Sequence, residues 1–505
     1  MDACEPAKPA APDDRGDSDR AVELIGRVYG ELETLRAENE ALKREIAELK
    51  KQLAGSAATA KVSEPYSMRA EEKRQQTRGR GKRKESKKQR RGRIANEEKI
   101  GRAEETIDIY PDGIAHEHCK LSHVRVVWRM VDGRAKLLAY RMFRGPKKQY
   151  GVIPGVLGRS EFGLEIVITL AYMVHNVGLS LDKACLLLGF LQNLKLSKSP
   201  ADALLRQLSR HWAEEFEVLC TLLANSLVVH ADETGWSINS VWAFLSEKAR
   251  LVLYGVHKDA ATLKELLDPE SFAGLVVSDD AAVYENFSNS QKCWAHLLRK
   301  AIKLSLLDPQ NENYRSFTDR LLDIYHEANR IKNDRRLGDA GRERKVEELE
   351  SDIFGLCGPV TLVHLPPTGP SHDRLLLALE IMRLTLKKQL FTFVTAPPVQ
   401  QPNQATKPVG GTNNESERKL RDPAQARATG RTSKTIRGAR RTSILTSVLE
   451  SLRLYLPTYT LSSVIAEIQR WQETGRSCFR ELMEKLKLTL PKHSVLDAVL
   501  PIPSG

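Results

Sequence analysis

The sequence has few cysteines, and their arrangement indicates no disulfide framework. Its 505 residues include seven cysteines, an odd number, and no CxxC pair. Secreted proteins that depend on disulfides carry many cysteines in a short chain, usually in even number. The sequence therefore excludes that class and predicts a reducing, cytoplasmic environment.

Long apolar runs are also missing. The stretch at 164–175 is among the longest and has only twelve residues, whereas a membrane-spanning helix needs about 20. The N-terminal stretch 1–20 is acidic, rich in Pro and Ala, and predicted to be disordered. It lacks the charged and apolar regions of a secretory signal. We therefore expect a soluble protein with no membrane partner.

Positive charge is in excess. Lys and Arg number 78 against 65 Asp and Glu, which gives a net charge of +13. A field of this sign attracts polyanions, so the composition favours a nucleic acid partner over the alternative of a merely soluble basic protein. The chain also exceeds one compact core, because domains typically span about 100–200 residues. We expect several domains.

Residues 21–54 carry the heptad pattern of a leucine-zipper coiled coil. Apolar residues recur at alternating steps of three and four, and flanking Glu and Lys or Arg residues lie five positions apart. This pattern predicts a parallel homodimer, in which Asn39 pairs with its own copy. A single amphipathic helix packed on its own domain is the alternative. The predicted dimer contacts are Leu32, Leu35, Asn39, Leu42, Ile46 and Leu49.

A basic, disordered linker is predicted at 55–104. Between 73 and 93 the sequence has twelve Lys or Arg and no apolar residue, so this run cannot fold alone. It would bind DNA phosphates without sequence preference and in a salt-sensitive way; a linker without a role is the alternative. The candidate DNA contacts are Arg78, Arg80, Lys82, Arg83, Lys84, Lys87, Lys88, Arg90 and Arg91.

The segment 105–160 is predicted to be small and β-rich. It contains His116, His118, Cys119 and His123, which are residue types that bind zinc. Their spacing matches no closed four-ligand pattern, so surface histidines are the preferred interpretation and a zinc cofactor is not expected.

A helical region is predicted at 161–222, with breaks near Gly178 and around 193–199. Its last part should begin at Ser199 as N-cap, followed by Pro200 and the dipole-complementing Asp202. Two helices with basic projections resemble a helix-turn-helix in outline, although most helix pairs only pack. The candidate DNA contacts here are Arg206 and Arg210.

The stretch 223–304 predicts three antiparallel strands, a helix and a fourth strand. The first and the last strand each end in a carboxylate, Asp232 and Asp279. On neighbouring strands two such ends would bring the carboxylates together, where they repel unless a divalent cation holds them. Hard oxygen ligands of this kind suit Mg²⁺. For either residue alone, a turn or cap role is the alternative.

A Pro- and Gln-rich linker is predicted at 396–411. After turn-forming glycines and asparagines, a helix follows on which Glu417, Leu420 and Arg421 lie three or four residues apart. Glu417 could share a helix face with the cation behind it, and a plain salt-bridged helix is the alternative.

Four ordered motifs resemble the insertion sequence 66 family of bacterial transposases. They are HADETGW at 230–236, VVSDDAAVY at 276–284, CWAHLLRK at 293–300 and TNNESERKLR at 412–421. The resemblance covers most of the chain. It implies an α/β fold with a ribonuclease-H-like catalytic domain interrupted by a helical insertion at 305–395, preceded by the coiled coil and a mainly helical DNA-binding region. The catalytic core would resume at 412–475, and 476–505 would form a C-terminal tail.

The resemblance also assigns site residues. Its three catalytic, metal-binding acids fall on Asp232, Asp279 and Glu417, in preference to the adjacent Asp280 and Glu415. These acids would hold two Mg²⁺ ions, with Mn²⁺ as a substitute. Structural roles near the site and DNA contacts on the last helix fall on Cys293, His296, Asn413, Asn414, Arg418 and Arg421.

Two departures from the family pattern concern Thr412, where many relatives have Asp, and Cys119, which stands alone where relatives have a cysteine-paired zinc-binding segment. The first leaves the three acids intact, and the second puts zinc in doubt.

The resemblance implies a transposase that cleaves DNA at the ends of a mobile element and joins them to target DNA. It would act as a homodimer in the bacterial cytoplasm, on the nucleoid when bound to DNA, with accessory proteins of the same element as further partners. A catalytically silent DNA-binding protein of transposase origin, or a nuclease without strand transfer, remains an alternative.

Overall fold

The computed structural model describes residues 96–362, 368–403 and 405–502, together with four residues at 41, 44, 45 and 48. The chain divides into two compact units, Met1–Arg93 and Ile94–Gly505, and nearly all described residues belong to the second. Ala41, Arg44, Glu45 and Glu48 are helical and exposed. The predicted dimer contacts and the basic run 73–93 lie outside the described residues, so they stay predictions.

The second unit begins with a small sheet, as expected for 105–160. Helix α3 precedes three strands in the order β1-β3-β2, in which β1 is parallel and β2 antiparallel to β3. Asp132 and Gly133 join β2 to β3 with positive φ angles of 51° and 77°, which is the two-residue turn that suits the twist of a hairpin. The bounds are α3 (Asn96–Gly101), β1 (Glu105–Ile109), the short helix η1 (His116–His118), β2 (Lys120–Val131) and β3 (Arg134–Arg144).

Four helices follow, as the sequence predicts. They are α4 (Leu164–His175), α5 (Leu181–Gln192), α6 (Lys198–His211) and α7 (Ala213–Ala224). The Ser180 side chain accepts a hydrogen bond from the Lys183 amide and caps α5. The predicted start of α6 is wrong, because the helix begins at Lys198 with Ser197 at the N-cap position, and Ser199 lies inside the first turn.

A five-stranded mixed sheet forms the centre of the unit, in the order β6-β5-β4-β7-β8. The first three strands pair antiparallel, whereas β4, β7 and β8 are parallel. The four strands expected from the sequence are confirmed, while β8 has three residues and gave no recognisable pattern. The bounds are β4 (Val228–Gly235), β5 (Ser240–Ser246), β6 (Arg250–Val256), helix α8 (Ala260–Leu266), β7 (Leu275–Ser278), the short helix η2 (Ala282–Tyr284) and β8 (Ser290–Lys292).

Side-chain alternation gives the central sheet two buried faces. One face, which includes Val229, Ala231 and Val276, packs into the large core formed with α4–α7 and the C-terminal helices. The opposite face, which includes Val228 and Val277, packs on a separate cluster from a helical bundle and on α14. Residues two apart on a strand share a face, so the face of each later site residue follows from this pattern.

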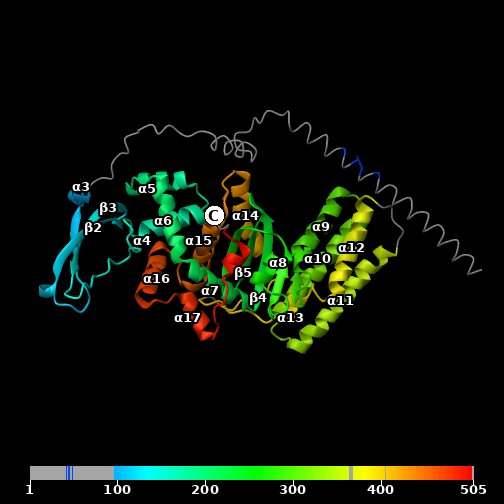
Figure 1. The fold of residues 1–505 in the computed structure, drawn as a ribbon. Coiled ribbons are helices and arrows are strands. Elements are labelled where there is room, and N and C mark those ends of the chain that lie inside the picture. Colours follow the sequence, from blue (N-terminus) through cyan, green and yellow to red (C-terminus); the bar gives the residue numbers. More distant parts are fainter. Residues whose placement is uncertain are drawn as a thin grey trace, which may run out of the picture. The chain divides into compact units, whose positions relative to one another are not determined.

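The helical bundle lies between β8 and the last part of the site (Figure 1). It consists of α9 (Trp294–Leu307), α10 (Glu312–Asn333), α11 (Asp339–Thr361), α12 (Pro370–Leu386) and α13 (Thr392–Thr395). The expected insertion at 305–395 is helical, but α9 starts before it and shares its core. The expected linker 396–411 is a packed connection, because Val399 pairs with Lys407 in a β-bridge and both Val399 and Val409 are buried.

The chain ends with α14 (Asn414–Ala428), α15 (Ile436–Tyr455), α16 (Leu461–Thr474), α17 (Cys478–Lys485) and α18 (Val495–Val499). The expected tail at 476–505 is folded: the carboxylate of Glu217 on α7 accepts hydrogen bonds from the Val495 and Leu496 amides at the start of α18. Among the described residues, no helix has both the length and the apolar character needed to cross a membrane.

Helix α15 closes the open edge of the sheet at β6. Its serines recur every four residues and therefore share one helix face, and each accepts a hydrogen bond from an outward-facing strand amide. The pairs are Tyr254 with Ser443 at 2.9 Å, Val252 with Ser447 at 2.9 Å and Arg250 with Ser451 at 3.0 Å. The amides of an edge strand, which otherwise invite pairing with another chain, are thus satisfied inside the unit.

Candidate active site

Asp232 and Asp279 lie next to each other at the carboxyl ends of two parallel strands. Strand β4 pairs with β7 in a register that sets Val228 beside Leu275 and His230 beside Val277. The same offset sets Asp232 beside Asp279, which directly follows β7. Side-chain alternation directs both carboxylates to the face that packs on α14 and α9. The structure therefore brings these two predicted residues together.

The Asp232 carboxyl is partly buried and carries uncompensated negative surroundings. Burial raises its pKa from 3.8 to about 7, and the charges of Glu233, Asp279 and Glu417 raise it further, although a hydrogen bond from the Glu233 amide at 2.9 Å opposes them. All of the other predicted acids thus act on Asp232 electrostatically. A carboxyl in this setting holds its proton until a cation is near.

Asn413 ties α14 to the strand that carries Asp232. The fully buried side chain donates from Nδ2 to the Ala231 carbonyl at 2.7 Å and accepts a hydrogen bond from the Ser416 hydroxyl through Oδ1. Its own amide donates to Cys293 Sγ at 3.1 Å, at the start of α9. Asn413 therefore fixes the first turn of α14, and with it Glu417, relative to β4 and α9. Asn414 is exposed.

Glu417 faces cationic and soft groups on α9. Its carboxylate accepts hydrogen bonds from Arg299 at 2.6 and 2.8 Å, and its Oε1 lies 3.6 Å from Nδ1 of His296. Cys293, His296 and Glu417 offer ligand atoms that all lie within 4.8 Å of one another. The expected partner on its own helix, Arg421, is exposed and forms no ion pair among the described residues. Glu417 thus lies beside the two aspartates but is held by α9.

The two neighbouring acids have partners of their own. Asp280 pairs with Arg383 of α12. Glu415 pairs with Arg250 at 3.0 Å and lies 3.5 Å from Nζ of Lys407. Burial would raise the pKa of Glu415, but these two cations hold it below its usual value. Both acids are therefore neutralised by fixed cations.

Glu233 is a fourth acid near the site that sequence reasoning did not single out. It lies on the opposite face of β4 from Asp232, where it accepts a hydrogen bond from the Tyr284 hydroxyl at 2.6 Å and pairs with Lys258. The adjacent acids in the ADET sequence were the available signal. Its role in the site is to add negative charge beside Asp232.

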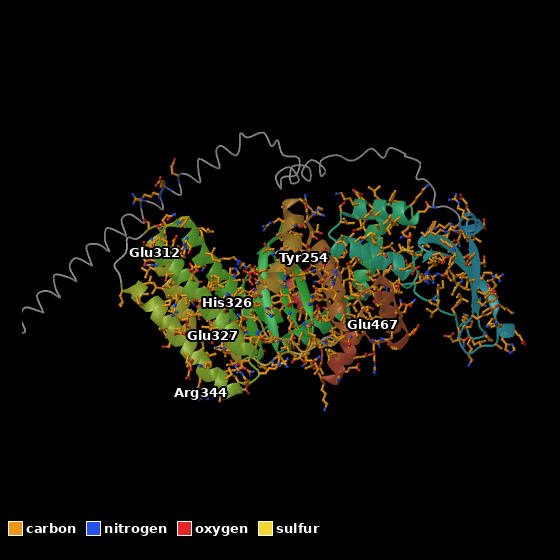
Figure 2. All side chains as sticks on the ribbon, turned by 180° about the vertical axis from the view of Figure 1, so that it is seen from behind. Tyr254, Glu312, His326, Glu327, Arg344 and Glu467 are labelled. Carbon is orange, nitrogen blue, oxygen red and sulfur yellow. The ribbon has the colours of Figure 1, made fainter. Side chains whose placement is uncertain are left out.

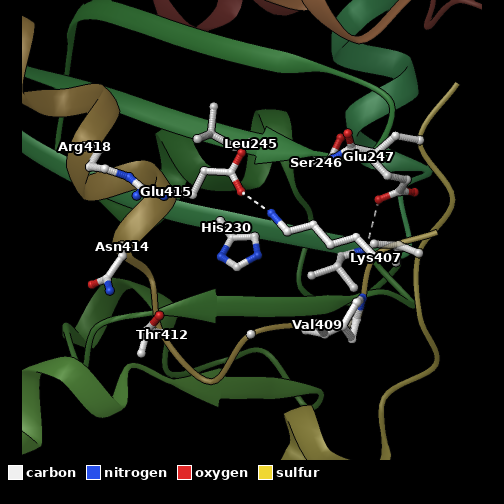
Figure 3. Close-up of a pocket in the computed structure, with 15 residues that line it drawn as sticks. His230, Leu245, Ser246, Glu247, Lys407, Val409, Thr412, Asn414, Glu415 and Arg418 are labelled. Carbon is white, nitrogen blue, oxygen red and sulfur yellow. Dashed lines mark hydrogen bonds and ion pairs between the residues drawn. The ribbon is translucent and has the colours of Figure 1, made fainter. Parts of the chain in front are cut away.

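A cavity of about 270 Å³ lies next to the site on the same face of the sheet. Figure 3 shows His230, Glu415 and Lys407 lining it, with Arg418 on the adjoining turn of α14. Burial lowers the pKa of His230, so its imidazole is neutral, and its Nδ1 has no hydrogen-bond partner among the described residues. The sequence analysis predicted Arg418 but missed His230, because a histidine inside a strand motif carries no spacing pattern.

The predicted arginines of α6 point away from its buried face. Arg206 pairs with Asp202 at 3.1 Å, and Arg210 is exposed without an ion pair among the described residues. The zinc-type residues of the small sheet have other contacts: His116 stacks on Tyr110, and Cys119 donates to the Ala115 carbonyl at 3.6 Å.

Comparison with known families decides the classification. The sequence model described as the Transposase IS66 family matches residues 159–441, which is more than half of the chain. The chain belongs to this family. The match spans α4 to the first turn of α15, so this IS66-family chain has all three predicted acids inside the family region. A search of curated proteins found no match. Membership supports a transposase function in general terms, with DNA as substrate and a divalent metal ion as the usual cofactor of such enzymes.

Proposed function

We propose that this protein is the DNA transposase of a mobile insertion element and that it cleaves and joins DNA through Asp232, Asp279 and Glu417. The observation that carries the proposal is the equal register of Asp232 and Asp279 on adjacent parallel strands, with Asp232 in a strongly negative setting. Membership of the IS66 transposase family supports the reaction class.

The fold is proposed to be ribonuclease-H-like. Three antiparallel strands followed by two parallel ones, in the order β6-β5-β4-β7-β8, support this assignment. The helical bundle between β8 and α14 then corresponds to an insertion between the second and the third acid. Ligands of open sheets gather at the carboxyl ends of the parallel strands, which is where the two aspartates lie.

The donor set fits a hard divalent cation. Asp232 and Asp279 supply oxygen ligands of the kind that Mg²⁺ or Mn²⁺ takes, and the raised pKa of Asp232 reflects negative charge that nearby lysine and arginine side chains leave uncompensated. Glu417 would complete the set after exchanging Arg299 for the cation. Two bound Mg²⁺ ions would activate the attacking oxygen and stabilise the leaving oxygen.

The residues of the site would divide the remaining work. Asp232 loses its proton when it becomes a ligand, and Arg299, released from Glu417, becomes free to bind a DNA phosphate. Lys292 donates to the backbone carbonyl of Asp279 at 3.0 Å and so orients the second acid. In the first step, a water oxygen bonds to phosphorus and the 3′-oxygen leaves; in the second, that 3′-hydroxyl attacks target DNA and displaces another 3′-oxygen.

The remaining parts would organise the DNA. The predicted zipper at 21–54 would pair two copies so that both element ends are handled together, and the basic run at 73–93 would hold phosphates. Arg206 and Arg210 would contact DNA from the helical region, and Arg418 and Arg421 from α14.

The test is cleavage and joining of labelled element-end DNA with Mg²⁺ or Mn²⁺. The variants Asp232→Asn, Asp279→Asn and Glu417→Gln keep side-chain size while removing charge. The matched controls Asp280→Asn and Glu415→Gln remove the neighbouring acids, which pair with fixed cations. We expect the first three to lose more than about 100-fold in cleavage rate, as for essential groups that stabilise the transition state, while DNA binding persists.

The controls separate the two halves of each acidic pair. We expect Asp280→Asn and Glu415→Gln to retain cleavage within about tenfold of wild type, because loss of a structural ion pair costs only about 1 kcal/mol at a partly exposed position. Wild-type DNA binding without any metal-dependent cleavage, with the accessory proteins of the element present, would refute the proposal.

A further inference from the structure

A second cluster of cations, away from the three acids, lines a cavity of about 620 Å³ between α6 and α15. Its arginines come from two helices that are far apart in sequence and packed together in space. They are Arg206 and Arg210 from α6 and Arg437, Arg440 and Arg441 from α15. The five are called the α6–α15 arginine pocket below.

Fixed carboxylates neutralise only part of this charge. Asp202 pairs with both Arg206 and Arg441, and Asp497 pairs with Arg440 at 2.6 Å. Five guanidinium groups thus face two carboxylates, an excess of three positive charges. None of the lining residues is acidic.

The two unpaired guanidinium groups lie at the exposed side of the pocket. Arg210 and Arg437 are both exposed and form no ion pair among the described residues. Arg440, in contrast, is fixed by hydrogen bonds to the Leu496 and Leu500 carbonyls, the second at 2.7 Å. The pocket therefore combines a rigid inner arginine with two free outer ones, an arrangement that favours a ligand with repeated negative charges.

The sequence of this region explains the charge. Between Asp422 and Glu450 the chain has no acidic residue and six basic ones, at 427, 431, 434, 437, 440 and 441. Arg441 also lines a neighbouring cavity of about 390 Å³, together with Arg431 and Lys434. The positive surface therefore continues from the pocket along the turn between α14 and α15.

We propose that the α6–α15 arginine pocket binds the phosphate backbone of double-stranded DNA, at a site separate from the three acids. The proposal deepens the proposed function and rests on it for the choice of DNA as the polyanion. Arg210, which sequence reasoning placed on a DNA-binding helix, works here with Arg437 of α15. Contacts of this kind fix the position of the duplex without reading its sequence.

The experiment measures binding of the full-length protein to a fluorescent DNA duplex of arbitrary sequence, without divalent metal, over a range of salt concentrations. The test variant is Arg210→Gln with Arg437→Gln. The matched control is Arg335→Gln with Arg344→Gln, which removes two exposed arginines that also form no ion pair among the described residues. Arg344 lies on the helical bundle, as Figure 2 shows.

We expect the test variant to weaken binding and to flatten its salt dependence. Each lost phosphate contact removes about 0.9 from the slope of log affinity against log salt. For two contacts, the ratio of wild-type to variant affinity then changes by about tenfold between about 50 and 200 mM salt. The control variant should keep the wild-type slope. Equal slopes for the two variants would overturn the proposal.

Further arms separate other outcomes. If inorganic phosphate, replacing chloride at equal ionic strength, abolishes the difference between wild type and test variant at millimolar concentration, the pocket binds free phosphate and the proposal is wrong. Unchanged thermal melting of the test variant excludes misfolding as the cause. A flattened slope in a protein that never cleaves DNA would support the pocket and count against the proposed catalytic function, so the two failures are distinguishable.

Discussion

Replacing Asp232 by Asn should stabilise the metal-free protein, and the size of this effect can be worked out from the structure. The pKa of Asp232 is raised from 3.8 to about 7, mainly by burial. Each pKa unit corresponds to about 1.4 kcal/mol, so ionised Asp232 lowers the free energy of unfolding by at most about 4 kcal/mol. Because the side chain is partly exposed, solvent screening reduces this to about 2 kcal/mol.

The sign follows from the raised pKa. In the unfolded chain the carboxyl ionises near 3.8, whereas in the folded protein it keeps its proton up to about pH 7. The folded state therefore binds more protons in this window, and wild-type stability falls as pH rises from about 4 to 7. Asn has no such titration and can still accept the hydrogen bond from the Glu233 amide. The advantage of the variant should grow through this window and stay constant above it.

The assay is thermal melting without divalent metal at about pH 5 and pH 8. We expect the difference in melting temperature between the variant and wild type to be larger at pH 8, by on the order of 2–5 °C for about 2 kcal/mol. Addition of Mg²⁺ at pH 8 should raise the melting temperature of wild type more than that of the variant. A variant that is equally or less stable than wild type at pH 8 would refute the reasoning.

Three further predictions follow from contacts around the site. Arg299→Gln should lower the Mg²⁺ concentration for half-maximal cleavage by about two- to fivefold, because the Glu417 carboxylate no longer has to leave a guanidinium worth up to about 1 kcal/mol; an unchanged requirement would argue against the exchange. Asn413→Ala should reduce cleavage but not DNA binding, since it releases α14 from β4; parallel loss of both would contradict this. Ser447→Ala should lower the free energy of unfolding by about 1–3 kcal/mol, because the Val252 amide is left buried without an acceptor, and a melting temperature equal to wild type would count against it.

The strands of the central sheet were predictable because each is a short apolar run that ends in a polar residue. Asp232 and Asp279 could be identified at strand ends from sequence, but their equal register could not, since it depends on the parallel pairing of β4 with β7. Strand β8 was missed because three residues carry no periodicity. The segments expected as a linker and a tail were misjudged because composition reports neither the burial of Val399 nor the cap that Glu217 provides for α18.

Charge pairing was the least predictable part of the site. Sequence spacing pointed from Glu417 to Arg421 on the same helix, whereas its partner in the structure is Arg299 on α9. Local spacing can propose partners only within one element, and the packing of α9 beside α14 brings a different cation closer. For the same reason Arg206 and Arg210 were recognised on α6, while Arg437 on α15 was not.

The acids of the site are neutralised in two different ways, and the difference bears on how a metal would bind. Asp232 is neutralised by a proton, because burial and its acidic neighbours raise its pKa to about 7. Glu417 is neutralised by the guanidinium of Arg299, at 2.6 Å. A divalent cation that takes both carboxylates must therefore displace one proton and one arginine, so metal binding releases a proton below about pH 7. The same event frees Arg299 next to the metal, where a DNA phosphate can replace the lost carboxylate. On this argument metal and DNA bind the site cooperatively, because each completes a charge balance that the other disturbs.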